Sequence, residues 1–340
     1  MIETSHLQHP TYHTRFFIFY FPDMELDGRI KIKAESGFGG VAGVTWLENK
    51  IYVVCWESNR IFVFSDQKPF DRLEKDEIEI KEMKNPWDIT ASRGRRSIFI
   101  SDWDEASKCL WKIQMEDKQV SRWKMDGSPY GLSITSSDEL LVVVWESDGR
   151  DYLYIYRSSD VCRLKRISFP MKIKDAFHAV QSSNGNYIIL YGTGEWIESD
   201  EEENAFEGGK VIKRKKRRRS VNLVSEMTVD GSIVRTFNPS SFESIPSKWN
   251  PRHLSIDSDD NIFIADVKGD RVFLLNSQLT DLQILLTKDR HRIVRPSSLC
   301  YLREKQQLIV GEDGSVGNDG ETVSIWNLRP TTTDDRQGQS

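Results

Sequence analysis

Cysteine is scarce in this sequence, and its four cysteines, Cys55, Cys109, Cys162 and Cys300, lie far apart. No two of them have the C-x-x-C spacing of zinc ribbons, RING domains or thioredoxin-type redox motifs, so these classes are excluded. A low cysteine content is typical of proteins from reducing compartments. We therefore expect a cytoplasmic protein.

Long apolar runs are also missing. None approaches the ~18 residues that a membrane-spanning helix needs. The longest early run, Phe16–Phe21, is followed by no small-residue cleavage site. We predict a strand there, and neither a membrane segment nor a signal peptide. The sequence has no G-x-S-x-G motif, no Walker loop and no dinucleotide-binding G-x-G-x-x-G after a strand, so it predicts no catalytic residues and no cofactor.

What the sequence does contain is an internal repeat of about 44 residues. The segments Val53–Arg60 and Val142–Arg150 are alike and lie two such units apart, with Ile98–Asp104 between them. A second mark, a turn residue followed by a short apolar strand, opens each unit. Its copies are Ala42–Val44, Pro86–Ile89, Pro129–Leu132, Ala176–Val180, Pro251–Leu254 and Pro296–Leu299. Six units therefore fit between about residues 41 and 330.

Each unit has the pattern of four short strands. The apolar second strand suits burial on both faces, and the alternating fourth strand, as in Glu77–Lys81, suits an outer edge. We predict an all-β, six-bladed β-propeller of four-stranded antiparallel blades, closed by the N-terminal strand Arg29–Lys33. The expected organisation is a segment 1–28 with one apolar strand, a propeller over 29–330 with a charged insertion at about 197–220, and a polar tail 331–340.

The repeats resemble NHL repeats, and the fullest copy comprises Pro251–Asp257, Asn261–Asp266 and Asp270–Leu275. NHL propellers form the C-terminal modules of tripartite-motif proteins and bind protein or RNA there. The resemblance implies a non-catalytic interaction module and no enzyme. The chain resembles more distantly the gluconolactonase-type, calcium-dependent six-bladed hydrolases, which are the alternative. Those take a metal ligand from a Glu in the first blade's opening strand, and the matching stretch here, Gly39–Val44, has no Glu.

Carboxylates recur at the ends of the apolar second strands. A recurring group indicates a structural role, because a catalytic group need appear only once. Such a carboxylate can accept N–H groups from the loop that follows it or pair with the next arginine (Arg60, Arg150 or Arg271). The alternative is a ring of carboxylates that holds a cation at the axis; we predict no metal ligand. The carboxylates are Glu57, Asp102, Glu146, Asp266 and Glu312.

Three tryptophans, Trp56, Trp103 and Trp145, flank these carboxylates at matching strand ends. One interpretation is that each packs between neighbouring blades. The other is that they lie near one face of the ring and anchor a partner, since Trp and Arg dominate binding hot spots.

The insertion joins an acidic block, Glu198–Glu203, to a basic run, Lys210–Arg219. Three interpretations are open: a solvated loop in which the blocks neutralise each other, a nuclear-localisation signal, or a patch that contacts RNA phosphates. The expected partner is a protein, with RNA as the second choice, and we expect a monomer. The seven consecutive cations are Lys213, Arg214, Lys215, Lys216, Arg217, Arg218 and Arg219.

Overall fold

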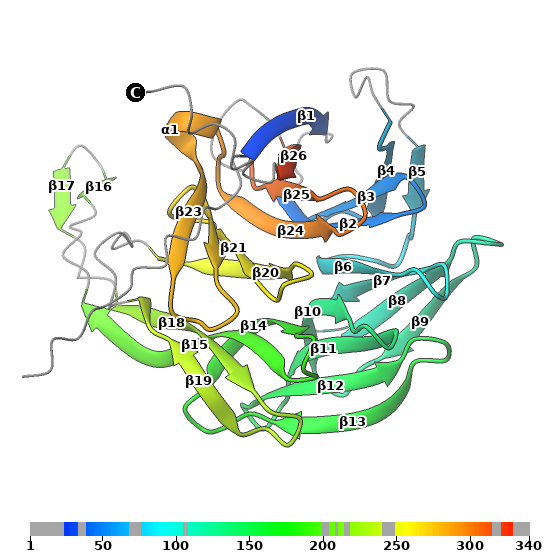
Figure 1. Cartoon of the computed structure of the whole chain (residues 1–340), viewed down its shortest axis with the longest axis horizontal. Coiled ribbons are helices and arrows are strands. Elements are labelled where there is room, and N and C mark those ends of the chain that lie inside the picture. Colours follow the sequence, from blue (N-terminus) through cyan, green and yellow to red (C-terminus); the bar gives the residue numbers. More distant parts are fainter. Residues whose placement is uncertain are drawn as a thin grey trace, which may run out of the picture.

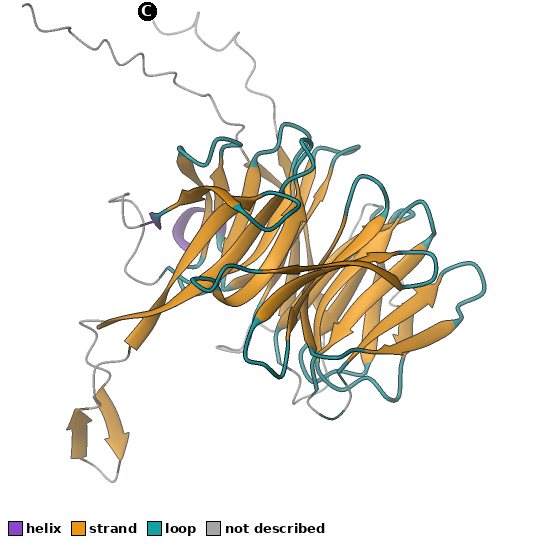
Figure 2. Ribbon diagram, turned by 90° about the horizontal axis from the view of Figure 1, so that it is seen from below, coloured by secondary structure: helices purple, strands orange, loops and turns teal. Residues whose placement is uncertain are grey.

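The computed structural model describes residues 24–32, 39–67, 76–104, 106, 108–198, 204–207, 210–213, 218–239, 249–314 and 321–328. Six four-stranded antiparallel sheets surround a central axis (Figure 1), which confirms the predicted six-bladed propeller. Strands predominate in the side view as well (Figure 2). The helix α1 (Lys288–His291) is a single turn, and no helix in the described ranges is long and apolar enough to cross a membrane.

The blades follow one another along the chain. Blade 1 contains β2 (Val41–Leu47), β3 (Lys50–Cys55), β4 (Arg60–Ser65) and β5 (Asp76–Glu79). Blade 2 contains β6 (Pro86–Ser92), β7 (Ser97–Asp102), β8 (Cys109–Gln114) and β9 (Val120–Lys124). Blade 3 contains β10 (Ser128–Ile134), β11 (Glu139–Trp145), β12 (Asp151–Arg157) and β13 (Cys162–Ser168).

Blade 4 contains β14 (Lys174–Gln181), β15 (Tyr187–Glu198), β18 (Arg218–Met227) and β19 (Ile233–Phe237). Blade 5 contains β20 (Pro251–Ile256), β21 (Ile262–Asp266), β22 (Arg271–Leu275) and β23 (Leu282–Thr287). Blade 6 contains β24 (Pro296–Leu302), β25 (Gln307–Glu312), β26 (Glu321–Leu328) and β1 (Met24–Ile32).

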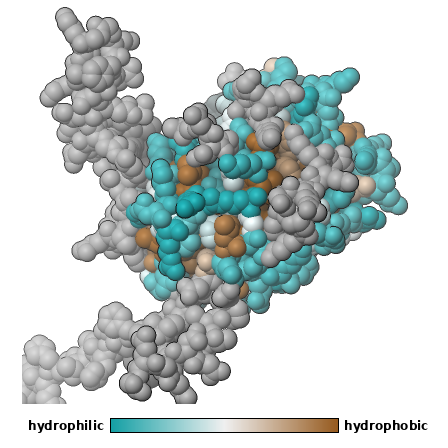
Figure 3. Space-filling view, turned by 90° about the horizontal axis from the view of Figure 1, so that it is seen from above, coloured by the Kyte–Doolittle hydropathy of each residue, from teal (hydrophilic) through white to brown (hydrophobic). Residues whose placement is uncertain are grey.

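Burial follows the order of strands within a blade. In blade 2, every residue of β7 is buried, whereas β9 alternates between exposed and half-buried residues. The hydrophobic cores lie between neighbouring blades: each of six clusters of buried side chains combines residues from two adjacent blades. A middle strand is therefore covered on both faces, as its unbroken apolar sequence predicts. The rim seen in Figure 3 is mainly hydrophilic, with small apolar patches between polar side chains.

The two ends of the described chain meet in blade 6. Strand β1 pairs antiparallel with β26, from Met24 opposite Leu328 to Ile32 opposite Glu321. The predicted closure is confirmed, but the strand begins at Met24 and not at Arg29. The sequence pattern missed these first residues, because a bulge between Leu26 and Gly28 breaks the two-residue alternation. The predicted strand Phe16–Phe21 lies outside the described residues.

The insertion lies in blade 4, between β15 and β18. There β16 (Asn204–Glu207) and β17 (Lys210–Lys213) pair with each other and with no blade strand in the described ranges. The acidic residues 199–203 and the basic residues 214–217 lie outside the described residues.

Candidate functional site at the centre of the ring

The first strand of every blade carries a bulge near its start. The register shifts, for example, between Pro86 and Asp88 in β6 and between Pro251 and His253 in β20. Equivalent shifts occur in β2, β10, β14 and β24. A bulge re-aims side chains, and it explains why proline, which cannot donate to a ladder, is the first residue of β6, β20 and β24 and the second residue of β10. The side chains at and just after the bulges line the centre of the propeller.

Six equivalent residues form what we call the axial ring. Three of them cap backbone N–H groups of a neighbouring blade. The Asp88 Oδ2 atom accepts the Leu132 N–H at 2.8 Å, and His253 Nδ1 accepts the Leu299 N–H at 3.3 Å. The third, Ser298 Oγ, accepts a backbone N–H of β2 at 3.0 Å. Innermost strands have no strand partner toward the axis, so these caps satisfy donors that would otherwise be orphaned. The ring residues are Gly43, Asp88, Gly131, His178, His253 and Ser298.

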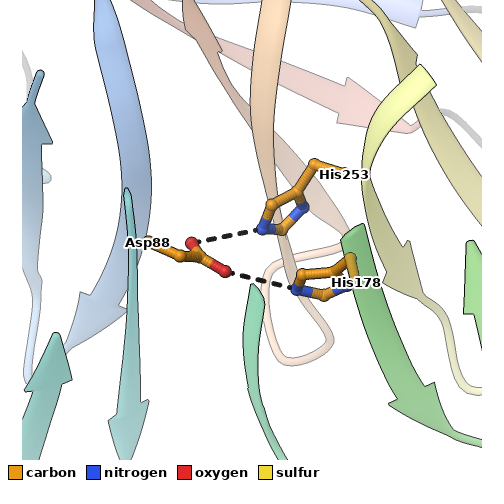
Figure 4. Close-up of side chains that lie close together, drawn as sticks. All are labelled: Asp88, His178 and His253. Carbon is orange, nitrogen blue, oxygen red and sulfur yellow. Dashed lines mark ion pairs between the residues drawn. The ribbon is translucent and has the colours of Figure 1, made fainter. Parts of the chain in front are cut away.

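Asp88, His178 and His253 converge from blades 2, 4 and 5 (Figure 4). The His178 Nε2 atom lies 3.4 Å from Asp88 Oδ2, and His253 Nε2 lies 3.4 Å from Asp88 Oδ1. The two imidazole rings are in contact, with centroids 3.9 Å apart. Asp88 and His178 are 1% exposed and His253 is 8% exposed, so all three side chains are buried.

The hydrogen bonds assign the protons in this cluster. Because His253 Nδ1 accepts the Leu299 N–H, the proton of the neutral ring is on Nε2, facing Asp88. His178 Nε2 lies 3.0 Å from the Leu132 carbonyl oxygen as well as near Asp88, so it too carries a proton. Burial lowers the pKa of His178, which keeps its imidazole neutral near pH 7.

Asp88 is the anion of this cluster. Burial alone would raise the pKa of the Asp88 carboxyl, but the interactions with His253 and His178 outweigh it and hold that pKa well below its usual range. Its oxygens also accept the N–H groups of Leu132 and Ile89, each at 2.8 Å. An ionised carboxylate thus faces four N–H donors.

We tested whether the cluster fits a metal ion, since its three nearest ligand atoms lie within 4.8 Å of one another. A metal would need the Nε2 lone pairs, whereas both Nε2 atoms carry protons. Histidine ligands usually donate their other ring N–H to an acceptor. Here Nδ1 of His253 meets an N–H donor, and Nδ1 of His178 is buried without a partner among the described residues. The donor set fits a carboxylate between two neutral imidazoles better than a metal site.

Two cavities adjoin the axial ring. The first, of about 230 Å³, is lined by residues at or before the ring position, and we call it the Arg252 cavity. The second, of about 500 Å³, is lined by the residues that follow the ring position on the same strands. The Arg252 cavity comprises Gly39, Gly40, Ala42, Trp56, Trp87, Asp88, Gly131, Phe177, His178, Arg252, His253, Val267, Arg295, Ser297 and Asp313.

A cleft of about 460 Å³ adjoins the Arg252 cavity and shares Trp87, Phe177 and Arg252 with it. We call it the aromatic groove. The Trp87 ring contacts Trp103 and Tyr130 edge to face, with centroids 5.8 and 5.1 Å apart. The groove comprises Trp87, Trp103, Tyr130, Trp145, Asp151, Asp175, Ala176, Phe177 and Arg252.

The three tryptophans singled out from the sequence lie at these two spaces. Trp56 lines the Arg252 cavity, while Trp103 and Trp145 line the aromatic groove. Trp145 is 42% exposed, whereas Trp56 is half-buried with its ring centroid 5.1 Å from that of Trp87. The structure thus brings these tryptophans to adjoining spaces, although they come from three different units of the repeat.

The repeated carboxylates do not gather at the axis. Asp102, Asp266 and Glu312 are buried and accept N–H groups from the loop that enters the first strand of their own blade; the donors are Lys84, Asn85, Asn250 and Val294. Glu146 accepts the Tyr154 hydroxyl and pairs with Arg166 at 2.7 Å, and Glu57 is exposed. Arg60, expected beside Glu57, pairs instead with Glu77 of β5 at 3.2 Å.

Of the basic run, Lys213 ends β17, and Arg218 and Arg219 begin β18. Arg214, Lys215, Lys216 and Arg217 lie outside the described residues. The structure therefore does not test the predicted nuclear-localisation or RNA role.

Asp88, His178, His253 and Arg252 were not among the residues predicted from the sequence. All four stand in the second or third position of the mark that opens each unit. When the six copies are aligned, the third position reads Gly43, Asp88, Gly131, His178, His253 and Ser298. At this one position of an otherwise apolar strand, all six copies have glycine or a polar residue. That pattern was the signal in the sequence that could have identified the site.

The chain matches no protein-family model and no curated protein sequence. Solved structures resemble it at low sequence identity. Virginiamycin B lyase from Staphylococcus aureus is 10% identical with a TM-score of 0.55, over 90% of this chain and 100% of that one. The PQQ-bound aldose sugar dehydrogenase from Streptomyces coelicolor is 10% identical with a TM-score of 0.59, over 90% of this chain and 98% of that one.

A protein of unknown function from Bacteroides thetaiotaomicron is also similar, with 11% identity and a TM-score of 0.60 over 91% of this chain and 76% of that one. At these identities the comparisons show the propeller fold alone, which hosts unrelated functions. The NHL resemblance stays a prediction.

Proposed function

We propose that this propeller is a non-catalytic interaction module of NHL type, which binds a peptide segment of a protein partner in the aromatic groove. The observation that carries the proposal is the groove itself, where five aromatic rings from blades 2, 3 and 4 line one cleft. Tryptophan and tyrosine dominate the energetics of protein interfaces because they bury a large area at a low entropic cost.

The charges of the groove indicate the kind of segment. Asp151 and Asp175 contribute carboxyl groups to the groove, and Arg252 supplies a cation at the border with the Arg252 cavity, so an acidic group of the segment would have to lie at that border. Trp145 presents an indole ring that is 42% exposed. An extended segment with an acidic group next to an apolar or aromatic side chain would satisfy both features.

The calcium-dependent hydrolase alternative finds less support. Calcium binds six to eight oxygen ligands. Of the six axial ring positions, Asp88 alone carries a carboxylate, and its oxygens already accept two backbone N–H groups. The repeated carboxylates Asp102, Asp266 and Glu312 are directed to entry loops of their own blades.

Selection from a displayed random-peptide library tests the proposal. Peptides selected on the wild type should bind Trp145→Ser at least about tenfold more weakly, the cost of removing one hot-spot residue. Val234→Ser is the matched control, because Val234 is an exposed apolar residue (54%) on the outer strand β19. Peptides that bind Trp145→Ser as tightly as the wild type would overturn the proposal.

A further inference from the structure

Arg252 lies in the bulge of β20 and is a half-buried cation. It makes no hydrogen bond or ion pair with any residue in the described ranges, and its Nε atom is shielded from solvent without a partner. Arginine is rarely buried unless paired, because desolvating a charge costs several kcal/mol. Burial lowers the pKa of Arg252, as expected for such a cation.

Aromatic rings surround the guanidinium. Its Cζ atom lies 5.8 Å from the ring centroid of Trp56, 5.6 Å from that of Trp87 and 6.0 Å from that of Phe177. These cation–π contacts favour a positive charge. However, the ring faces do not accept the hydrogen bonds of the five guanidinium N–H groups as oxygen atoms would.

The nearest carboxylate of the cavity wall is already engaged by another arginine. Asp313 Oδ2 accepts hydrogen bonds from Arg295 Nε at 3.1 Å and Arg295 Nη2 at 2.7 Å. This pair compensates the positive charge of Arg252 only in part, because Asp313 attracts that charge while Arg295 repels it.

A second donor in the same cavity also has no acceptor. Trp56 Nε1 is shielded from solvent and has no hydrogen-bond partner among the described residues. Buried polar groups are nearly always hydrogen-bonded, so two unsatisfied donor groups that line one cavity indicate a missing acceptor.

We infer that the Arg252 cavity binds a carboxylate group, which the guanidinium of Arg252 holds in a bidentate pair while the indole N–H of Trp56 donates to it. Guanidinium and carboxylate match in geometry. A carboxylate fits better than a phosphate, because aromatic rings form part of the cavity wall and the carboxylates of Asp88 and Asp313 lie at the same cavity. A dianion would meet stronger repulsion there.

This inference rests on the proposed function and names the chemistry that the site recognises. The groove shares Trp87 and Phe177 with the cavity, so the group that bears the carboxylate is aromatic or apolar and lies in the groove. A peptide can supply that carboxylate from its C-terminus or an acidic side chain, and a small aromatic acid presents the same group.

The test titrates the full chain with phenylacetate and with its neutral isostere phenylacetamide, following the fluorescence of the tryptophans around Arg252. A second arm compares groove-selected peptides with free and amidated C-termini. The wild type should bind the acid at least about tenfold more tightly than the amide. Arg252→Met should weaken binding of the acid by about 100-fold, since a charge-assisted bidentate pair is lost.

Arg163→Met is the matched control, because the Arg163 Cζ atom also lies over an aromatic ring, 4.9 Å from the centroid of Tyr154, but outside the cavity. It should leave acid binding unchanged. Arg252→Met should also keep or increase the resistance to urea, because a half-buried cation that is compensated only in part is removed; a purely structural arginine would give the opposite.

Equal binding of acid and amide, or an Arg252→Met variant that binds the acid like the wild type, would overturn the carboxylate site. These outcomes are separable from failure of the proposed function. Peptides that depend on Trp145 but ignore Arg252 support the interaction module and refute the carboxylate site. Small acids that depend on Arg252, with no peptide that depends on Trp145, support the carboxylate site and refute the peptide-binding role.

Discussion

Replacing Asp88 by asparagine should destabilise the propeller by about 3–5 kcal/mol. Each Asp88 oxygen accepts one backbone N–H at 2.8 Å and faces one histidine Nε2 at 3.4 Å. If an amide NH2 replaced either oxygen, it would face one backbone N–H and one histidine Nε2–H, and neither of these donors could form a hydrogen bond with it. At about 1.5–3 kcal/mol for each lost hydrogen bond to a charged group, two lost bonds give this magnitude.

Urea unfolding followed by tryptophan fluorescence measures the change. Asp126→Asn is the control, because Asp126 pairs with Arg163 at the surface and its side chain is 77% exposed, so its loss should cost less than about 1 kcal/mol. If Asp88→Asn unfolds within about 1 kcal/mol of the wild type, the carboxylate is not the ionised acceptor that the structure indicates.

The same residue predicts a pH dependence with a definite sign. The pKa of Asp88 is lower in the folded protein than in the unfolded chain, so its contribution is present above the ordinary aspartate pKa of about 3.9. That contribution is lost as the pH falls below this value. Stability measured between pH 5 and pH 3 should therefore fall more steeply in the wild type than in Asp88→Asn, and parallel curves would contradict the assignment.

Three further predictions concern other parts of the chain. Gly131→Ala should destabilise the ring by about 3 kcal/mol or more, because its Cβ would lie 2.4 Å from the Phe177 carbonyl oxygen and 2.7 Å from His178 Cδ2; thermal unfolding measures this, and an unchanged midpoint refutes it. Burial raises the pKa of Asp266 to about 6, so its contribution to stability is full below pH 4 and is lost as the pH rises through 6. The free energy of unfolding, measured with urea from pH 4 to pH 7, should therefore decline less in Asp266→Asn than in the wild type, and the difference should be at most about 3 kcal/mol. Replacing residues 213–219 by Gln and Ser should abolish any RNA binding by filter assay and its salt dependence, and unchanged binding excludes the basic run as an RNA site.

The repeat made the architecture predictable from the sequence. Turn residues such as Pro86 and Pro251 mark the start of each blade, and alternation in Arg29–Lys33 identified the closing strand. The start of that strand at Met24 could not be predicted, because the bulge after Leu26 removes the alternation there.

The candidate site was harder to predict for a physical reason. Asp88, His178 and His253 belong to three blades, and their contacts depend on how the ring closes, which no local pattern encodes. The distinctive feature of Arg252 is the missing partner, and this becomes visible only once packing shows what surrounds it.

The closure of blade 6 has a consequence for biosynthesis. Among the described strands of the propeller, β1 is synthesised first and its partner β26 last; Asp27 and Asn327, which are hydrogen-bonded, stand 300 residues apart. Strand β1 therefore stays unpaired with β26 until the other five blades have been synthesised, and contacts of such long range form slowly. Until β26 is available, blade 6 lacks its outer strand β1. Blade 6 also supplies the Leu299 N–H that His253 accepts in the axial ring. Removal of Met24–Ile32 or of Glu321–Leu328 would eliminate this pairing, so the ring closes only after β26 has been synthesised.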